Sequence, residues 1–136
     1  MPHVIIEYSA NVADHHDIDA LVGVVHDAVV ANGIGPHGGV RTRAIVRDHY
    51  RVGDGDPANA MIAMVARLGP GRNAETKKAF IDEILDAAEA HTMGESSALD
   101  IAWSLEVQEI DAEFRVNRNH VATAMADRTE TDRGER

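Results

Sequence analysis

The chain begins with MPHVIIEYS (residues 1–9), the stretch from which the rest of the fold is built. Its β-branched centre, Val4-Ile5-Ile6, predicts a strand that starts at the N-terminus. If Met1 is removed by the usual processing, Pro2 becomes the first residue and carries a free secondary amine. An α-amino group titrates near pH ~8, and burial and nearby cations both disfavour its charged form. Pro2 is therefore a candidate neutral general base; the alternative is that it is only a stable N-terminal residue.

Hydrophobic periodicity after this strand predicts a helix and a second strand, which complete a β-α-β unit. The helix is expected to begin after a cap residue, Asp14 or Asp17, to run to about residue 32 and to end at Gly33. Residues 40–52 then alternate between apolar and basic side chains, a pattern typical of a strand with one apolar face and one strongly basic face.

A second β-α-β unit follows a break at residues 53–57, which are rich in glycine and aspartate. Residues 59–68 predict a strand that is largely apolar on both faces and therefore central in the sheet. A helix capped by Asn73 is expected from residue 74 to about 91, and its apolar residues share one face. Residues 99–110 alternate clearly and predict the last strand of the unit.

This element order predicts an α+β fold in which the two β-α-β units form a four-stranded mixed sheet with both helices on one face. A ferredoxin-like split arrangement has the same element order, and the pattern does not separate the two. The other face of the sheet would be bare, which is tolerable where several copies place their bare faces together around a symmetry axis. We expect one domain over residues 1–125, ending in a mixed segment, and a polar, disordered tail over 126–136.

The composition indicates a single soluble domain, because 136 residues are too few for two ordinary ones. A formal net charge of -10 argues against nucleic acid and anionic membranes as partners. The chain has no cysteine, so thiolate chemistry and disulfides are excluded. No stretch is long and apolar enough to span a bilayer and no signal peptide opens the chain, so we expect a cytoplasmic protein.

Arginines at two places stand out from this acidic background. Arg41 and Arg43 share the basic face of the strand predicted over residues 40–52, and guanidinium groups bind carboxylates in a bidentate manner. Arg72 lies in a glycine-rich turn that leads into a helix, where free N–H groups and the helix dipole favour an anion. Taken singly, each is more often an ordinary surface residue. Together with a neutral amine at Pro2, they would suit an enzyme that moves a proton on a small polyacid.

The eight histidines do not have the spacing of metal ligands. His15 and His16 lie side by side at a predicted helix start, where neighbouring side chains diverge, so we interpret them as capping or solvated residues. His3 follows Pro2 directly and is expected to point to the opposite side of the strand. The sequence therefore predicts no metal site.

Several motifs occur together in the order Pro2-His3, Glu7-Tyr8-Ser9-Ala10-Asn11, Gly39-Val40-Arg41-Thr42-Arg43, Asp54-Gly55, Gly69-Pro70-Gly71-Arg72, Asn117 and Asn119-His120-Val121. In this order and spacing the chain resembles the 5-carboxymethyl-2-hydroxymuconate isomerases of the tautomerase superfamily. The resemblance extends from Pro2 to about Met125 and leaves out only the tail. The chain departs from the family pattern at Tyr8, in the few aromatic residues near the third strand and in the longer tail. These departures bear on the identity of the substrate more than on the type of reaction.

The resemblance implies a tautomerase-like homotrimer that uses no cofactor and no metal. It implies that Pro2 of the processed chain is the acid/base catalyst of a keto-enol tautomerase or delta-isomerase, an intramolecular oxidoreductase. The implied substrate is a dienol with three carboxylates, from bacterial degradation of homoprotocatechuate and related aromatic acids. By position, Arg41 and Arg72 would bind the carboxylates and stabilise the dienolate charge, and Arg43 also matches the family pattern.

Two other interpretations remain open at this point. A hydratase or dehalogenase acting on small unsaturated acids would keep the Pro2 amine and add a carboxylate to activate water, for which Glu7 or Glu106 could be offered. A non-catalytic trimeric module would use the basic face to bind an acidic metabolite or partner. Replacement of Pro2 separates the catalytic interpretations from the non-catalytic one.

Overall fold

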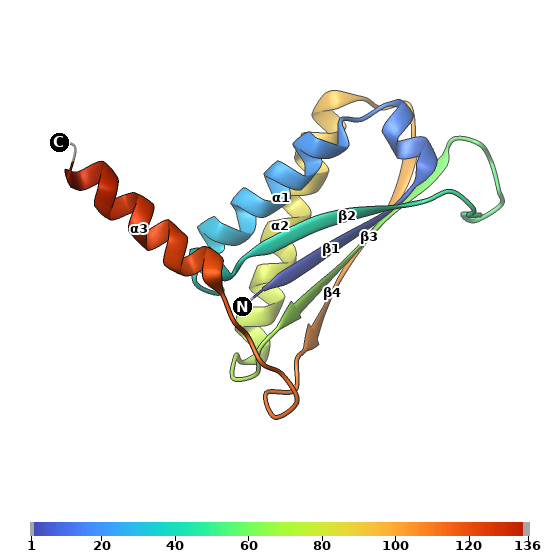
Figure 1. Ribbon diagram of the computed structural model, residues 1–136. Coiled ribbons are helices and arrows are strands. Elements are labelled where there is room, and N and C mark those ends of the chain that lie inside the picture. The colour runs from blue at the N-terminus through green and yellow to red at the C-terminus, as the bar shows by residue number, and fades with distance from the viewer. Residues whose placement is uncertain (1, 135–136) are drawn as a thin grey trace.

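The computed structural model of the protein describes residues 2–134 and contains one four-stranded sheet with two long helices on one face (Figure 1). In chain order the elements are β1 (His3–Ser9), the 3-10 helix η1 (Ala10–Asp14), α1 (Ile18–Asn32), the 3-10 helix η2 (His37–Gly39), β2 (Arg41–Arg47), β3 (Asn59–Leu68), α2 (Ala74–Glu95), β4 (Asp100–Glu109) and α3 (His120–Gly134). The two predicted β-α-β units and the mixed α+β sheet are confirmed, and α3 is an additional third helix.

The strands lie in the order β2-β1-β3-β4. β1 and β2 are parallel neighbours, β3 and β4 are parallel neighbours, and β1 and β3 pair antiparallel at the centre of the sheet. Each helix therefore connects two strands that are directly adjacent, whereas a split arrangement would insert another strand between them. The structure excludes the ferredoxin-like alternative and confirms that β3, largely apolar on both faces, is central.

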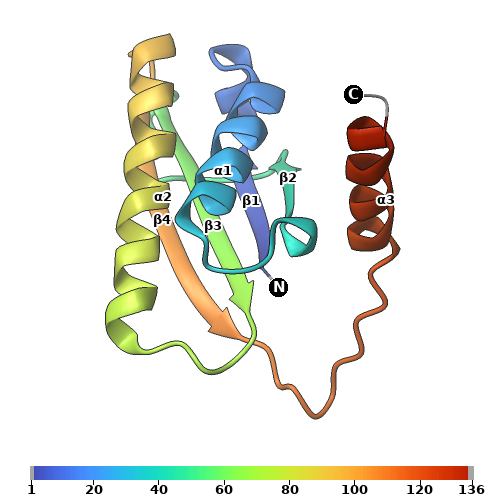
Figure 2. The same cartoon turned by 90° about the vertical axis from the view of Figure 1, so that its left-hand side faces the viewer.

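The hydrophobic core lies between the sheet and the pair α1 and α2, which run side by side across one face (Figure 2). Ile6 of β1 and Ile62 of β3 are completely buried there, as are Val25 of α1 and Phe80 and Ile84 of α2. Full burial of a side chain of this size contributes roughly 1.5–3 kcal/mol. The opposite face of the sheet carries no helix among the described residues, as the sequence predicted.

Both ends of α1 and the start of α2 are set by residues expected from the sequence. The Asp17 side chain accepts a hydrogen bond from the Ala20 N–H at 3.1 Å, and Gly33 ends α1 in the left-handed region at φ 76. The Asn73 side chain accepts from the Thr76 N–H at 2.8 Å at the start of α2. Because of these caps, the chain leaves α1 at Gly33 and enters α2 at Asn73. The loop after α1 and the turn before α2 both pass beside the start of β1.

β2 is shorter than predicted, because it ends at Arg47 and not at residue 52. The last pair in its register joins Arg47 to Ser9, where β1 also ends. A strand at the edge of a sheet has only one partner, so the alternating pattern beyond Arg47 has nothing to pair with. α2 continues to Glu95, one turn past the predicted end, and β4 lies within the predicted strand.

The C-terminal segment differs from the disordered tail expected over residues 126–136, because α3 is helical up to Gly134. α3 stands apart from the sheet (Figure 2) and meets η2 at Gly38, whose carbonyl accepts from Asn119 Nδ2 at 2.7 Å. The Asn119 side chain also accepts from the Ala122 N–H at 3.0 Å. α3 is supported by this cap and by its contact with η2 and has no apolar stripe, which is the signal that the prediction used. Residues 135–136 lie outside the described range.

Within residues 2–134, no helix combines the length and the apolar character needed to cross a bilayer.

Candidate active site

Pro2 lies at the start of β1 and is held by backbone on two sides. Its carbonyl accepts a hydrogen bond from the Arg41 N–H at 3.0 Å, and its side chain is fully buried. On the side of the loop after α1, a Cβ atom on Gly35 would lie only 2.8 Å from Pro2 Cδ. Carbon atoms in contact prefer roughly 3.5–4.0 Å, so a residue without a Cβ is needed here. Met1, whose removal the hypothesis requires, lies outside the described residues.

Arg72 reaches the same loop from the turn before α2. Its Nε donates to the Ile34 carbonyl at 2.9 Å and its Nη1 to the Gly69 carbonyl at 2.8 Å, and Nη2 also donates to Ile34. Nη2 lies 3.8 Å from the position that a Cβ on Gly35 would occupy, the same position that the Pro2 ring crowds. The structure thus brings Arg72 and Pro2 together, and at least three of the five guanidinium N–H groups hold backbone carbonyls.

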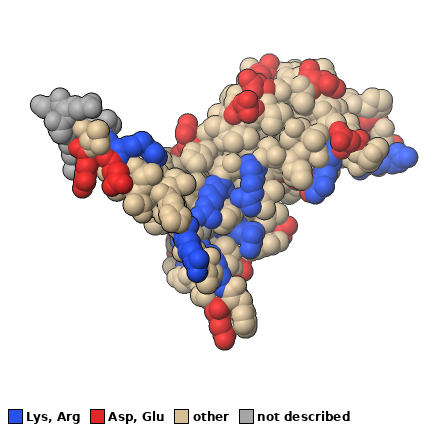
Figure 3. All heavy atoms as spheres, viewed as in Figure 1, with Lys and Arg blue, Asp and Glu red and all other residues tan. Residues whose placement is uncertain are grey.

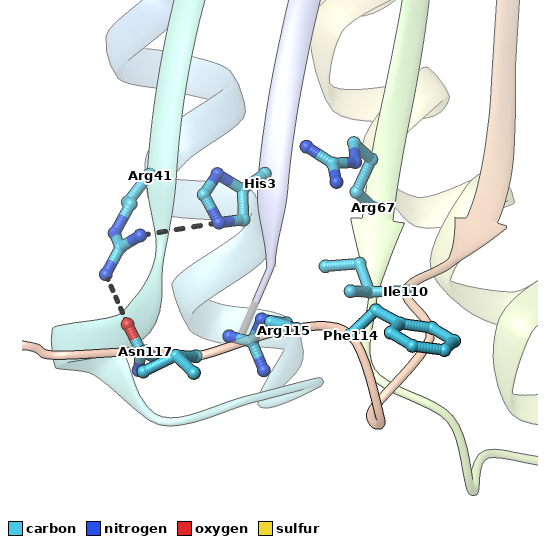
Figure 4. Close-up of a pocket in the computed structure, with 8 residues that line it drawn as sticks. His3, Arg41, Arg67, Ile110, Phe114, Arg115 and Asn117 are labelled. Carbon is cyan, nitrogen blue, oxygen red and sulfur yellow. Dashed lines mark hydrogen bonds between the residues drawn. The ribbon is translucent and has the colours of Figure 1, made fainter.

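Arg41 and Arg43 gather around His3 on the uncovered face of the sheet. Arg41 Nη1 lies 3.4 Å from His3 Nε2, and Arg43 Nη1 lies 3.2 Å from His3 Nδ1. Arg41 Nη2 also donates to Asn117 Oδ1 at 2.9 Å, so Arg41 connects β2 to the segment between β4 and α3 (Figure 4). His3 therefore points away from the helices, on the opposite side of the strand from the buried Pro2, as the sequence predicted, and Arg41 and Arg43 lie on the same side as His3.

The surroundings of His3 disfavour its charged form. Burial lowers the pKa of His3 below its ordinary value of 6.5, and the guanidinium groups of Arg41 and Arg43, followed by those of Arg67 and Arg115, lower it further. A neutral imidazole accepts at one ring nitrogen and donates at the other. Only one of its two arginine contacts is therefore a hydrogen bond in a given tautomer, and the other nitrogen carries an N–H.

Beside His3 and Arg41 a cavity of about 360 Å³ opens toward solvent (Figure 4). Arg67, which lies opposite His3 in the antiparallel register of β1 and β3, and Arg115, from the segment between β4 and α3, also line it. Its volume is in the range of small-molecule sites. Figure 3 shows basic side chains gathered over the uncovered side of the sheet, in a chain whose net charge is -10. The arrangement is suited to binding a small anion with more than one charge.

Sequence reasoning found neither Arg67 nor Arg115. The alternation of β3 puts Arg67 on the outward face, but only the register of β1 against β3 shows that it lies opposite His3. Arg115 lies in a segment without regular structure, and no sequence pattern connects it to the N-terminus. All four predicted site residues lie close to the start of β1, with Pro2 and Arg72 beside the loop after α1 and Arg41 and Arg43 on the uncovered face.

The carboxylates offered for activating water do not lie beside Pro2. Glu7 accepts from Arg47 Nη2 at 2.9 Å and lies five residues along β1, roughly 16 Å from Pro2 at the usual rise of a strand. Glu106 pairs with Val65 in the β3–β4 register, two strands away from β1. Within residues 2–134, no three histidine or carboxylate side chains gather in a way that could hold a metal ion.

Comparison with known proteins finds one family that matches nearly the whole chain. The profile of the 5-carboxymethyl-2-hydroxymuconate isomerase family matches residues 2–125. The 5-carboxymethyl-2-hydroxymuconate Delta-isomerase of Escherichia coli is 27% identical over 121 residues, which are 89% of this chain and 96% of that protein. A 5-carboxymethyl-2-hydroxymuconate isomerase from Deinococcus radiodurans R1 superposes with a TM-score of 0.80 at 25% identity, over 91% and 93% of the two chains. A fused 4-OT solved as a symmetric trimer shares the fold, with a TM-score of 0.60 at 24% identity over 90% of this chain and 98% of the other.

The fold, with its paired β-α-β units in one four-stranded sheet, defines a tautomerase-superfamily protein. More narrowly, the chain belongs to the 5-carboxymethyl-2-hydroxymuconate isomerase family, as the resemblance in its motifs predicted. This membership supports an isomerase activity.

Proposed function

We propose that the protein is a proton-transfer isomerase that converts a 2-hydroxymuconate-type dienol polyacid, similar to 5-carboxymethyl-2-hydroxymuconate, to its conjugated keto form. The observation that carries this proposal is that Arg72 lies beside Pro2 at the loop after α1, and that a cationic cavity opens beside the next residue, His3, and Arg41. Family membership supports the reaction class, and the charge of the cavity supports a substrate with carboxylates.

In the proposed reaction the Pro2 nitrogen takes the proton of the 2-hydroxyl group. The oxygen electron pair then forms the C=O bond, the double bonds shift along the dienol, and the protonated amine returns the proton to a carbon atom. The substrate is isomerised with no net gain or loss of atoms or electrons, so no cofactor is needed. Arg72 and Arg41 would stabilise the negative charge of the dienolate, and Arg43 would bind a carboxylate. The same cations favour the neutral amine at pH 7.

The proposal requires removal of Met1, since in a longer chain the Pro2 nitrogen belongs to an amide and has no basic electron pair. It also includes assembly to a homotrimer. The uncovered face of the sheet supports such assembly, because apolar Ile5 and Val65 lie on it between charged residues near the ends of the strands. A fused 4-OT of the same fold, solved as a symmetric trimer, gives a precedent for that arrangement. A role in catabolism of aromatic acids such as homoprotocatechuate would follow from the substrate.

Mass spectrometry of the mature protein, together with ketonisation kinetics on 2-hydroxymuconate, tests this proposal. We expect a chain that begins at Pro2 and is active. Pro2→Ala should lower kcat, because a primary amine on a freely rotating residue replaces the proline nitrogen, which the rigid ring holds in one position for proton transfer. Insertion of one alanine between Met1 and Pro2 should abolish activity while the circular dichroism spectrum is unchanged, because Pro2 then becomes an amide. Full activity of the folded insertion variant would refute Pro2 as the base.

A further inference from the structure

The cavity beside His3 contains more positive charge than the predicted site residues account for. Arg67 and Arg115 line it in addition to Arg41 (Figure 4). Arg115 Nη2 is buried and has no hydrogen-bond partner among the described residues. A buried guanidinium N–H group without a partner is unfavourable, and it is rare in folded proteins unless a ligand or water satisfies it.

Within residues 2–134, no acidic side chain forms an ion pair with these arginines. The ion pairs of this part of the chain involve Arg47, Lys77 and His16, and none includes Arg41, Arg67 or Arg115. Asn117 Oδ1 accepts from Arg41, which orders that guanidinium without cancelling its charge. Like charges around one cavity repel each other, so an anion that binds between them relieves the repulsion.

The lining of the cavity indicates what kind of anion would fit. Guanidinium groups present planar pairs of N–H donors that match the two oxygens of a carboxylate. Ile110 and Phe114 add apolar surface beside these donors. A carboxylate on a short carbon skeleton satisfies both parts of the lining.

We propose that Arg67 and Arg115 form a second carboxylate subsite, which binds the end of the substrate remote from the reacting atoms and so selects polyacids over monoacids. The inference rests on the proposed function for the identity of the substrate. The subsite begins close to Pro2 along the sheet: His3 follows Pro2 in the chain, and Arg67 is the cross-strand partner of His3, with their Cβ atoms roughly 4.5–5.5 Å apart. The proposal places the reacting end of the substrate at Pro2 and its remote carboxylate at Arg67 and Arg115.

Binding of an inert polyacid tests the subsite without any turnover. Isothermal titration calorimetry with propane-1,2,3-tricarboxylate should show affinity about tenfold to a hundredfold weaker for Arg115→Gln than for the wild type, as expected for loss of charge-assisted hydrogen bonds. Arg118→Gln, an exposed residue of the same segment that does not line the cavity, removes the same charge and should change the affinity by less than about twofold. Arg67→Gln is the second variant, in case Arg115→Gln does not fold.

Kinetics then test selectivity. With 2-hydroxymuconate, Arg115→Gln should raise KM about tenfold or more and leave kcat within a few-fold, whereas with 2-hydroxy-2,4-pentadienoate, which lacks the remote carboxylate, both should stay near wild type. Wild-type tricarboxylate binding by folded Arg115→Gln and Arg67→Gln, or an equal loss on both substrates, would overturn the subsite. Tricarboxylate binding that follows the predicted pattern in a protein without ketonisation activity would leave the subsite standing and would refute the proposed function.

Discussion

Replacement of Gly35 by alanine is the most direct test of how the fold positions the catalytic candidate. The new Cβ would lie 2.8 Å from Pro2 Cδ and 3.4 Å from Pro2 Cγ. The proline ring is rigid, and its carbonyl is tied to the Arg41 N–H at 3.0 Å, so it cannot rotate away from the contact. Pro2 or the loop must therefore move by about half an ångström or more to restore a normal carbon–carbon distance.

Two consequences of this displacement can be measured. Overpacking of a closely packed site costs about 1–3 kcal/mol of unfolding free energy. A shift of about 1 Å at a reacting group can cost about a hundredfold in rate, so a shift of about half that size should lower kcat/KM by roughly tenfold. We therefore expect Gly35→Ala to be both less stable and less active than the wild type.

Urea denaturation and ketonisation kinetics on 2-hydroxymuconate are the assays, with Gly23→Ala as the matched control. Gly23 lies inside α1, and no atom lies within 4 Å of the position of its added Cβ. Its replacement should raise the unfolding free energy by about 0.5–1 kcal/mol, because alanine is the better helix former, and should leave kcat/KM unchanged. Wild-type stability and wild-type kcat/KM of Gly35→Ala would show that Pro2 is not held against this loop.

Three further measurements test other parts of the structure. Burial and nearby guanidinium groups lower the pKa of His3, so an NMR titration of its ring should have a midpoint below pH 6.5. Saturating propane-1,2,3-tricarboxylate should raise that pKa. A midpoint at or above pH 6.5 in the free protein would contradict the geometry. The hydrogen bond from His16 Nδ1 to Glu95 Oε1, at 2.8 Å, is the main cause that holds the pKa of Glu95 below its ordinary value of 4.5. The contribution of ionised Glu95 to the free energy of unfolding is therefore complete above pH 4.5 and is lost as the pH falls through the lowered pKa. In urea titrations, Glu95→Gln should be less stable than the wild type at pH 7, and this difference should shrink toward pH 3. Ser9→Ala removes the acceptor of the Met61 N–H, now bonded at 2.9 Å, and should cost about 1–3 kcal/mol in urea unfolding; an unchanged midpoint would show that this hydrogen bond contributes nothing.

Interactions between residues close in the chain were predictable from the sequence. The caps Asp17 and Asn73 and the left-handed Gly33 lie where the pattern predicted them, because a cap bonds to a residue only three positions away. The alternation of β1 also predicted that His3 and Pro2 point to opposite sides of the strand. α3 was not predicted, since it depends on a cap at Asn119 and a contact with η2 and has no apolar stripe.

The sequence by itself determined the two β-α-β units, the uncovered face of the sheet and the arginines on β2, because helix and strand periods are local properties of the chain. Only the tertiary structure decided that the strands of each unit are adjacent, that β1 and β3 pair antiparallel, and that Arg67 therefore lies opposite His3. It also decided that Gly35 and Arg72 meet at Pro2, and that Arg115 reaches the same cavity as Arg41. These residues come from segments far apart in the sequence. Their positions depend on strand register and loop closure, and no local sequence pattern predicts either of these.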